Sequence, residues 1–295
     1  MQRFRNDRLF QGKTFPCYNN PMWILYLLPK KWLSYWTGKL VHLRLPAPLA
    51  QWSIETFAKA YKINLEEAEK PVSQYASIGD FFVRRLKPGA RPVAPHPVVH
   101  PADSQIAQIG EIRDGQCIQA KGRLYSVAEL CGDYELAKKF QDGLFVTYYL
   151  CPTDYHRVHS PVDGSIRKLR HIPGHLWPVN QWSTANIENL FAVNERVILE
   201  INSRVADCLL VFVGATNVGQ IRVNFDPEII TNVSGNREPQ EKIYEPPVTI
   251  SRGQELGAFH MGSTVVMIYP KAIRLQRGDW EIFQDQKVQV GGGFL

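Results

Sequence analysis

From residue 102 onward the chain consists largely of short apolar or alternating segments separated by Gly, Asp and Pro residues. Such segments are typical of β-strands joined by turns. One helix is predicted among them, over residues 126–141, where Ser126 can cap the N-terminus and Glu129 lies three residues on. Strands that follow an initial helical part predict an α+β fold with a large, mainly antiparallel sheet or a partly closed β-barrel. The predicted strands are 106–112, 117–120, 144–150, 165–171, 196–201, 208–213, 220–225, 248–251, 263–269 and 282–290.

The region before residue 102 predicts helices. Apolar residues recur near helical spacing over residues 49–70, and Pro71 ends the pattern. A second, short helix is predicted over residues 78–86. Five prolines between residues 87 and 101 make that stretch a poor helix and a poor central strand, so we expect an extended crossing loop. At the other end of the chain, the glycines at 291–293 predict a flexible tail.

The first 48 residues are basic and rich in aromatic side chains. They hold eight Lys and Arg residues and one Asp, a formal charge of +7, whereas the whole chain carries +6. The basicity therefore belongs to one end, which argues against a nucleic-acid-binding body and favours an anionic membrane surface. Trp, Tyr, Leu and Lys residues interleave from Trp23 to Lys39, which suits the headgroup region of a bilayer. We predict a membrane-associating segment over 1–48 and a separate α+β domain over 49–295. The alternative is that two short helices of this segment pack on the protein's own core.

The sequence offers no transmembrane helix and no disulfide framework. The longest early apolar run, residues 22–28, lies between two prolines and is far shorter than the roughly 20 residues that a spanning helix needs. No apolar run follows the first arginines directly, so we expect no secretory signal. The five cysteines are scattered and form no Cys-x-x-Cys pair, which favours a reducing compartment.

The residue types alone leave the chemistry open. Asp103, His159 and Ser263 could supply an orienting carboxylate, a base and a nucleophile, but such residues occur in most proteins of this size. His156 and His159 are three residues apart but lack an obvious third ligand, so no metal site is expected. The glycines of residues 214–219 match neither a phosphate-binding loop nor a dinucleotide-binding fingerprint.

Several motifs taken together resemble the phosphatidylserine decarboxylase family, in its prokaryotic form. Residues 261–264, Met-Gly-Ser-Thr, are similar to the family's Leu-Gly-Ser-Thr self-cleavage motif, and residues 155–159, Tyr-His-Arg-Val-His, match its Tyr-His-Arg-x-His signature. The matches keep their order and run from about residue 20 to 270, so together they are far more specific than any one alone. The further matches are Phe-Phe-Val-Arg at 81–84, Pro-Ala-Asp at 101–103, Asn-Glu-Arg-Val at 194–197 and Val-Gly-Ala-Thr-Asn-Val-Gly at 213–219.

Two positions depart from the family's pattern. Met261 replaces the usual Leu, an apolar residue of similar volume, and we expect little effect. Ser104 stands where the family usually has Gly after Pro-Ala-Asp. If that position needs a positive φ, Ser104 strains the turn that holds Asp103.

The resemblance implies a chain that makes its own cofactor. Ser263 would attack the carbonyl of Gly262, with His159 as base and Asp103 as its orienting partner, and the resulting ester would be eliminated. The products would be a β chain of residues 1–262 and an α chain of residues 263–295 that begins with a pyruvoyl group derived from Ser263. That ketone would form a Schiff base with phosphatidylserine, which would lose CO2 to give phosphatidylethanolamine. His156 would donate the proton that replaces the carboxylate.

The resemblance also implies where the protein works and with what. The β and α chains would stay together as a heterodimer, with a higher homo-oligomer possible, and no metal or nucleic acid would take part. The enzyme would lie on the cytoplasmic face of the inner membrane as a peripheral protein. The alternatives are a pyruvoyl-dependent decarboxylase of another serine-headed or amino-acid substrate, an inactive lipid-binding relative, and a serine hydrolase. The last is disfavoured because Ser263 lies in no Gly-x-Ser-x-Gly motif.

Overall fold

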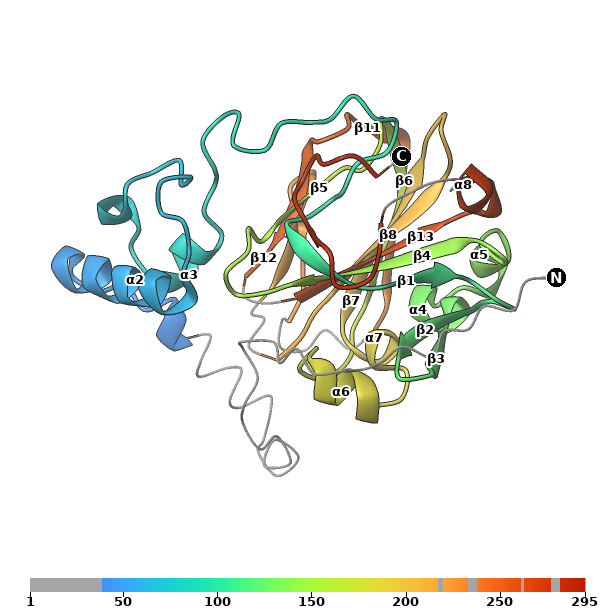
Figure 1. Cartoon of the computed structure of the whole chain (residues 1–295), viewed down its shortest axis with the longest axis horizontal. Coiled ribbons are helices and arrows are strands. Elements are labelled where there is room, and N and C mark those ends of the chain that lie inside the picture. Colours follow the sequence, from blue (N-terminus) through green and yellow to red (C-terminus); the bar gives the residue numbers. More distant parts are fainter. Residues whose placement is uncertain (1–38, 217–219, 233–237, 261–262, 277–281, 295) are drawn as a thin grey trace.

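A computed structural model describes residues 39–216, 220–232, 238–260, 263–276 and 282–294 (Figure 1). Its centre is an eight-stranded antiparallel sheet in the order β11-β6-β7-β8-β13-β4-β1-β14. In the described residues the two edge strands do not pair, so the sheet is open. The predicted α+β class with a large antiparallel sheet is confirmed. The strands are β1 (Ser104–Glu111), β4 (Leu144–Leu150), β6 (Gly164–Ile172), β7 (Arg196–Asn202), β8 (Cys208–Val213), β11 (Gln240–Ile250), β13 (Ser263–Tyr269) and β14 (Lys287–Val288).

Strand β13 lies inside this sheet, between β8 and β4. Its apolar run is buried on both faces, since Val265, Val266, Met267 and Ile268 are all inaccessible to solvent. Burial of such side chains stabilises a fold by about 2 kcal/mol each. A peptide chain cut just before this strand would therefore keep both its sheet hydrogen bonds and its apolar packing.

Different elements cover the two faces of the large sheet. A four-stranded sheet in the order β10-β9-β12-β5 lies on one face, where the rings of Phe212 and Phe259 are 5.3 Å apart. The β2–β3 hairpin and two short helices lie on the other, where Tyr125 contacts Phe145 and Phe191. The elements are β5 (Arg157–His159), β9 (Ile221–Val223), β10 (Asp226–Ile230), β12 (Glu255–Phe259), β2 (Gln116–Ala120), β3 (Arg123–Ser126), α6 (Gln181–Asn186) and α7 (Leu190–Val193).

The helical region before the sheet forms its own small core around Ile54 and Phe81. It contains α2 (Ala47–Tyr61), the single turn η2 (Val72–Gln74) and α3 (Ile78–Phe82). The predicted helix over 49–70 is wrong beyond Tyr61, because Lys62 takes a left-handed φ of 54° and ends α2. Residues 1–38 of the predicted membrane-associating segment lie outside the described residues. No described helix is both long and apolar enough to span a membrane.

The predicted helix over 126–141 is two short helices, α4 (Val127–Cys131) and α5 (Tyr134–Lys138). Ser126 caps α4 as expected, accepting hydrogen bonds from the backbone of Ala128 and Glu129. Gly132 then ends α4 with a φ of 64°, a conformation that glycine adopts without steric cost.

The C-terminal predictions are wrong. Within the predicted strand at 282–290, the described residues form only the two-residue β14 after helix α8 (Lys271–Gln276). The glycines at 291–293 are not a flexible tail. Gly291 N–H donates to the His100 carbonyl at 3.0 Å, His100 N–H donates to Gly292, and Phe294 is buried. The predicted crossing loop, residues 87–101, is confirmed and lies against this C-terminal segment (Figure 1).

Candidate active site

The predicted cleavage point lies where β12 leads into β13. Phe259 ends β12, and Ser263 begins β13 with its backbone opposite Leu150 of β4. Gly262, the other predicted residue of the cleavage site, lies outside the described residues. The peptide bond before Ser263 thus lies immediately before the first residue of a central strand.

His159, the predicted base, is the last residue of β5, which pairs with β12. Its Nδ1 lies 2.8 Å from the Gly253 carbonyl. Because a carbonyl only accepts, Nδ1 carries the proton and Nε2 keeps its lone pair, 3.4 Å from the Tyr155 hydroxyl. Burial lowers the pKa of His159. The ring is therefore a neutral imidazole whose free nitrogen can accept a proton near neutral pH.

Asp103, the predicted orienting residue, is held by other groups. Its carboxylate accepts hydrogen bonds from Nε and Nη2 of Arg91, at 2.6–3.0 Å, and from the Val290 backbone N–H at 2.9 Å. The structure brings the Asp103 segment to His159 through the backbone, since His159 N–H donates to the Pro101 carbonyl at 2.8 Å. The Nδ1 proton of His159, however, goes to Gly253 and not to Asp103.

His156, the predicted proton donor, is fully buried at the entrance to β5. Its Nδ1 donates to the Asp154 carbonyl at 2.9 Å, and its Nε2 has no hydrogen-bond partner among the described residues. The ring packs against Phe82 of α3, with centroids 4.0 Å apart. Burial lowers the pKa of His156 to about 3. In this state the residue is neutral and must take up a proton before it can donate one from Nε2.

Ser104 does not strain the backbone. It lies in β1, and its φ is outside the left-handed region that favours glycine. Its hydroxyl donates to the Ala102 carbonyl at 3.2 Å. The replacement of the usual glycine at this position therefore gives no structural reason for an inactive protein.

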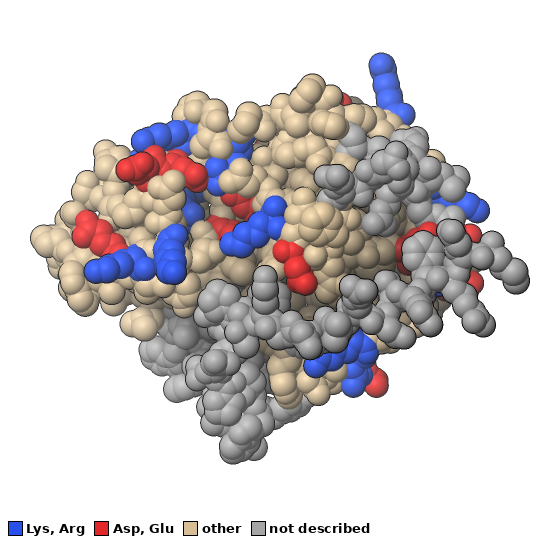
Figure 2. All heavy atoms as spheres, viewed as in Figure 1, with Lys and Arg blue, Asp and Glu red and all other residues tan. Residues whose placement is uncertain are grey.

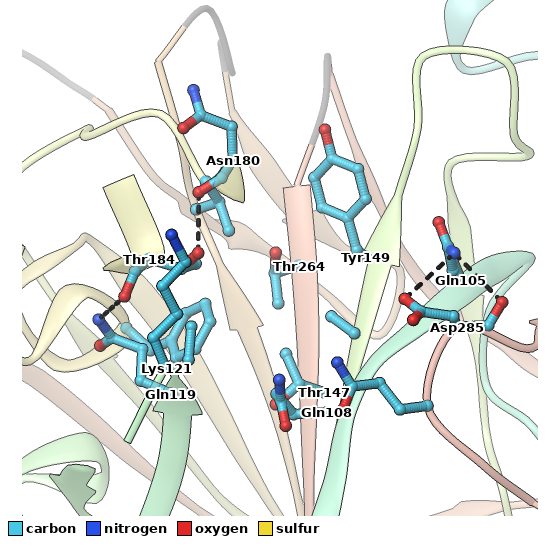
Figure 3. A pocket seen from close by; sticks show the side chains of 15 residues that line it. Gln105, Gln108, Gln119, Lys121, Thr147, Tyr149, Asn180, Thr184, Thr264 and Asp285 are labelled. Carbon is cyan, nitrogen blue, oxygen red and sulfur yellow. Dashed lines mark hydrogen bonds between the residues drawn. The ribbon is translucent and has the colours of Figure 1, made fainter. Parts of the chain in front are cut away.

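Cavities lie on both sides of this region. A hollow of ≈ 650 Å³ opens at Asp103 and is lined also by Arg84, Arg91 and Tyr155. A second cavity, of ≈ 270 Å³, lies at Thr264 on the face of β13 that the β2–β3 hairpin and α6 cover (Figure 3). Its labelled side chains are mostly amides and hydroxyls: Gln105, Gln108, Gln119, Thr147, Tyr149, Asn180, Thr184 and Thr264, with Lys121 and Asp285.

Sequence reasoning missed two partners of the predicted residues and the contact made by one further residue of the motif. Arg91 binds Asp103 from the proline-rich loop, and Gly253 binds His159 from the turn before β12. Arg157 lies inside the Tyr-His-Arg-Val-His motif and donates to the Val83 carbonyl at 2.7 and 2.9 Å. Only Arg157 had a sequence signal, its place in the motif. The other two contacts depend on how distant loops fold.

The residues present fit a pyruvoyl group at position 263. Such a group would form from the chain itself and would need a buried atom that can exchange protons. His156 Nε2 is such an atom, since it is buried and has no hydrogen-bond partner among the described residues. The backbone ties His156 to the end of β12, because Phe259 N–H donates to the His156 carbonyl at 3.0 Å, four residues before Ser263.

Comparisons with known proteins agree with these motifs. Residues 78–295 match the family model described as phosphatidylserine decarboxylase. A phosphatidylserine decarboxylase proenzyme of Anaeromyxobacter sp. (strain K) is 40% identical over 290 residues, 97% of each chain. The proenzyme of Myxococcus xanthus (strain DK1622) is 42% identical over 255 residues, 85% of this chain and 90% of its own. That of Yersinia enterocolitica serotype O:8 is 44% identical over 252 residues, 83% and 85% of the two chains. The chain belongs to the phosphatidylserine decarboxylase family.

Proposed function

We propose that the chain is the precursor of a phosphatidylserine decarboxylase, which converts phosphatidylserine to phosphatidylethanolamine and CO2. It cuts itself between Gly262 and Ser263 into a β chain of residues 1–262 and an α chain of residues 263–295. The observation that carries the proposal is the similarity, over 97% of the chain, to a relative named as the proenzyme of that activity. The placement of His156 and His159 beside β12, which leads into β13, supports it.

Self-cleavage needs a base for the Ser263 hydroxyl, and His159 is suited to that role. Its Nε2 carries a lone pair because Nδ1–H is committed to the Gly253 carbonyl. Its lowered pKa keeps it neutral and ready to accept a proton. Asp103, which is ion-paired with Arg91, interacts electrostatically with His159 and favours the imidazolium that forms after proton transfer.

Decarboxylation needs a group that moves one proton, and His156 is suited to that role. A pyruvoyl ketone at position 263 would supply the electrophile for the substrate amine and the electron sink for the breaking bond. The amine arrives as an ammonium group and must lose a proton, which His156 Nε2 can take. The same nitrogen can return the proton to the carbon that has lost CO2. Phe82 packs on the ring and shields it from water.

The β and α chains are expected to stay associated after cleavage. Strand β13 belongs to the α chain and is paired on both sides with strands of the β chain. Val290 of the α chain also donates to Asp103 of the β chain. We therefore infer a β–α heterodimer.

The experiment that tests this function is a turnover assay. The purified protein is incubated with vesicles that contain phosphatidylserine, and both CO2 and phosphatidylethanolamine are measured. Ser263→Ala is the matched control, because it lacks the hydroxyl that would become the ketone. Equal amounts of both products from the wild type and none from the control are expected. A wild type that cuts itself but turns over only a free amino acid would support the alternative decarboxylase.

The protein should dock on membranes through its N-terminal part. Leu40, Leu43, Leu49 and Trp52 are 72%, 51%, 47% and 64% exposed, and they follow the basic first 38 residues directly. We propose peripheral binding at the cytoplasmic face of the inner membrane, with these side chains at the level of the lipid headgroups.

A flotation assay with anionic liposomes tests this docking. The Leu49→Ser/Trp52→Ser variant should bind about tenfold more weakly or worse at every salt concentration, since apolar burial is worth about 2 kcal/mol per large side chain. The Lys30→Glu/Lys31→Glu variant should require lower salt than the wild type to bind, and its difference from the wild type should shrink once high salt screens the charges. Ile118→Ser/Leu124→Ser is the control, because it removes exposed apolar side chains from the β2–β3 hairpin. Docking through this part is refuted if all three variants float like the wild type.

A further inference from the structure

Arg84, just after α3, is a buried guanidinium with unused hydrogen-bond donors. The residue is 5% exposed, and its Nε and Nη1 have no hydrogen-bond partner among the described residues. One face of the guanidinium lies 5.1 Å from the ring centroid of Phe81. Burying a cation costs several kcal/mol unless other groups compensate it. Buried donors without acceptors are typical of a binding site in which the ligand supplies the missing acceptors.

The position of Arg84 suggests an anionic ligand. It lines the hollow of ≈ 650 Å³ that also contains Asp103 and Tyr155. The other guanidinium of that hollow, the partly buried Arg91, already binds Asp103 and Glu67. Lys62 and Lys287 add positive charge to the lining, which also contains Asp154, whose pKa burial raises to about 6. Basic and acidic side chains gather on the surface over this side of the molecule, around α2 and α3 (Figure 2).

The chain fixes Arg84 relative to the histidines of the candidate site. Arg157 lies between His156 and His159, and its guanidinium binds the carbonyls of Val83 and Arg84 at 2.7–3.4 Å. On the preceding turn, Phe82 packs against His156. The exposed apolar side chains of α2 lie in the same helical region. The same helical region thus carries Arg84, the ring that packs on His156 and exposed apolar side chains that could contact acyl chains.

We propose that Arg84 binds the phosphodiester of the substrate lipid, an inference that rests on the proposed function. The headgroup also carries a carboxylate, but that group leaves as neutral CO2. A cation bound to it would stabilise the substrate more than the transition state and would slow the reaction. The phosphodiester keeps its charge throughout, so an arginine bound to it anchors substrate and product alike.

The test compares Arg84→Met with Arg204→Met, which removes an exposed arginine from the turn between β7 and β8. Each variant is first checked for self-cleavage. The KM and kcat for short-chain phosphatidylserine and the inhibition constant of glycerophosphoethanolamine, which lacks the carboxylate, are then measured. For Arg84→Met we expect both KM and the inhibition constant to rise about 10- to 100-fold, with self-cleavage complete, because charge-assisted hydrogen bonds are lost. Arg204→Met should match the wild type.

A second readout separates ligand binding from a structural role. Arg84→Met should melt at or above the temperature of the wild type in phosphate-free buffer, since it removes a buried charge. Inorganic phosphate should raise the melting temperature of the wild type more than that of Arg84→Met. If Arg84→Met does not fold, Arg84→Lys replaces it, and its KM should still rise because lysine lacks the planar fork.

Three results would overturn the inference. The first is an unchanged KM in a self-cleaved Arg84 variant. The second is a raised KM with an unchanged inhibition constant for glycerophosphoethanolamine, which would assign Arg84 to the carboxylate. The third is a large loss of melting temperature in Arg84→Met with no effect of phosphate on either protein. A wild type that fails to decarboxylate phosphatidylserine would instead refute the proposed function.

Discussion

Replacing His159 with alanine should leave the purified protein as one uncut chain. The Ser263 hydroxyl is a weak nucleophile without a base, and a positioned base contributes about 10²- to 10⁴-fold in rate. We therefore expect self-cleavage to slow by at least about 100-fold. Denaturing electrophoresis of samples taken over time measures it. His175→Ala, which removes an exposed histidine, is the control and should be cut at the wild-type rate.

The pH dependence of cleavage gives an independent check on His159. Burial lowers the pKa of this residue, so the free base persists below the pH at which an ordinary histidine is protonated. The cleavage rate should stay level as the pH falls through 6.5 and decline only at lower pH. A rate that already falls by half at pH 6.5, or efficient cleavage of His159→Ala, would exclude His159 as the base in the proposed environment.

His156→Ala should separate the two reactions. The variant keeps His159 and Ser263, so it should cut itself, but it lacks the nitrogen that carries the proton between substrate amine and product carbon. We expect turnover of phosphatidylserine to fall by about 100-fold or more. Product formation is measured per cut chain, so that any slower maturation does not mimic a loss of turnover. Wild-type turnover by a matured His156→Ala protein would refute the assignment.

The central strands of the fold could be predicted because their sequence pattern is simple. Residues 144–150, 208–213 and 264–269 are largely apolar and, apart from the partly buried Tyr149, are buried. The structure reproduces the predicted strands 144–150, 208–213 and 263–269 as β4, β8 and β13. The three-residue β5 and the Gly-containing β12 were not predicted, because both are short. Their extended conformation depends on pairing with neighbouring strands. The same holds for the C-terminal glycines, which are ordered by backbone hydrogen bonds to residues 94–100.

The sequence motif pointed to His156 and His159, which lie three residues apart. The structure places both beside β12, a strand that was not predicted, and their roles in processing and turnover stay predictions. The contacts that set their protonation could not be predicted, because Gly253 and Asp154 act through backbone carbonyls that any residue could supply. Arg91 could not be assigned to Asp103 from sequence, since eleven residues of irregular loop separate them.

The intact mass of the purified protein reports both self-cleavage and the chemistry of the new chain end. We expect two species, one of residues 1–262 and one of residues 263–295. The second should be lighter by one ammonia than the same peptide beginning with serine, since conversion of Ser263 to a pyruvoyl group releases its nitrogen. A single uncut chain that fully decarboxylates phosphatidylserine would contradict self-cleavage as the source of activity. An active protein whose smaller chain begins with unmodified serine would contradict the conversion of Ser263 to a pyruvoyl group.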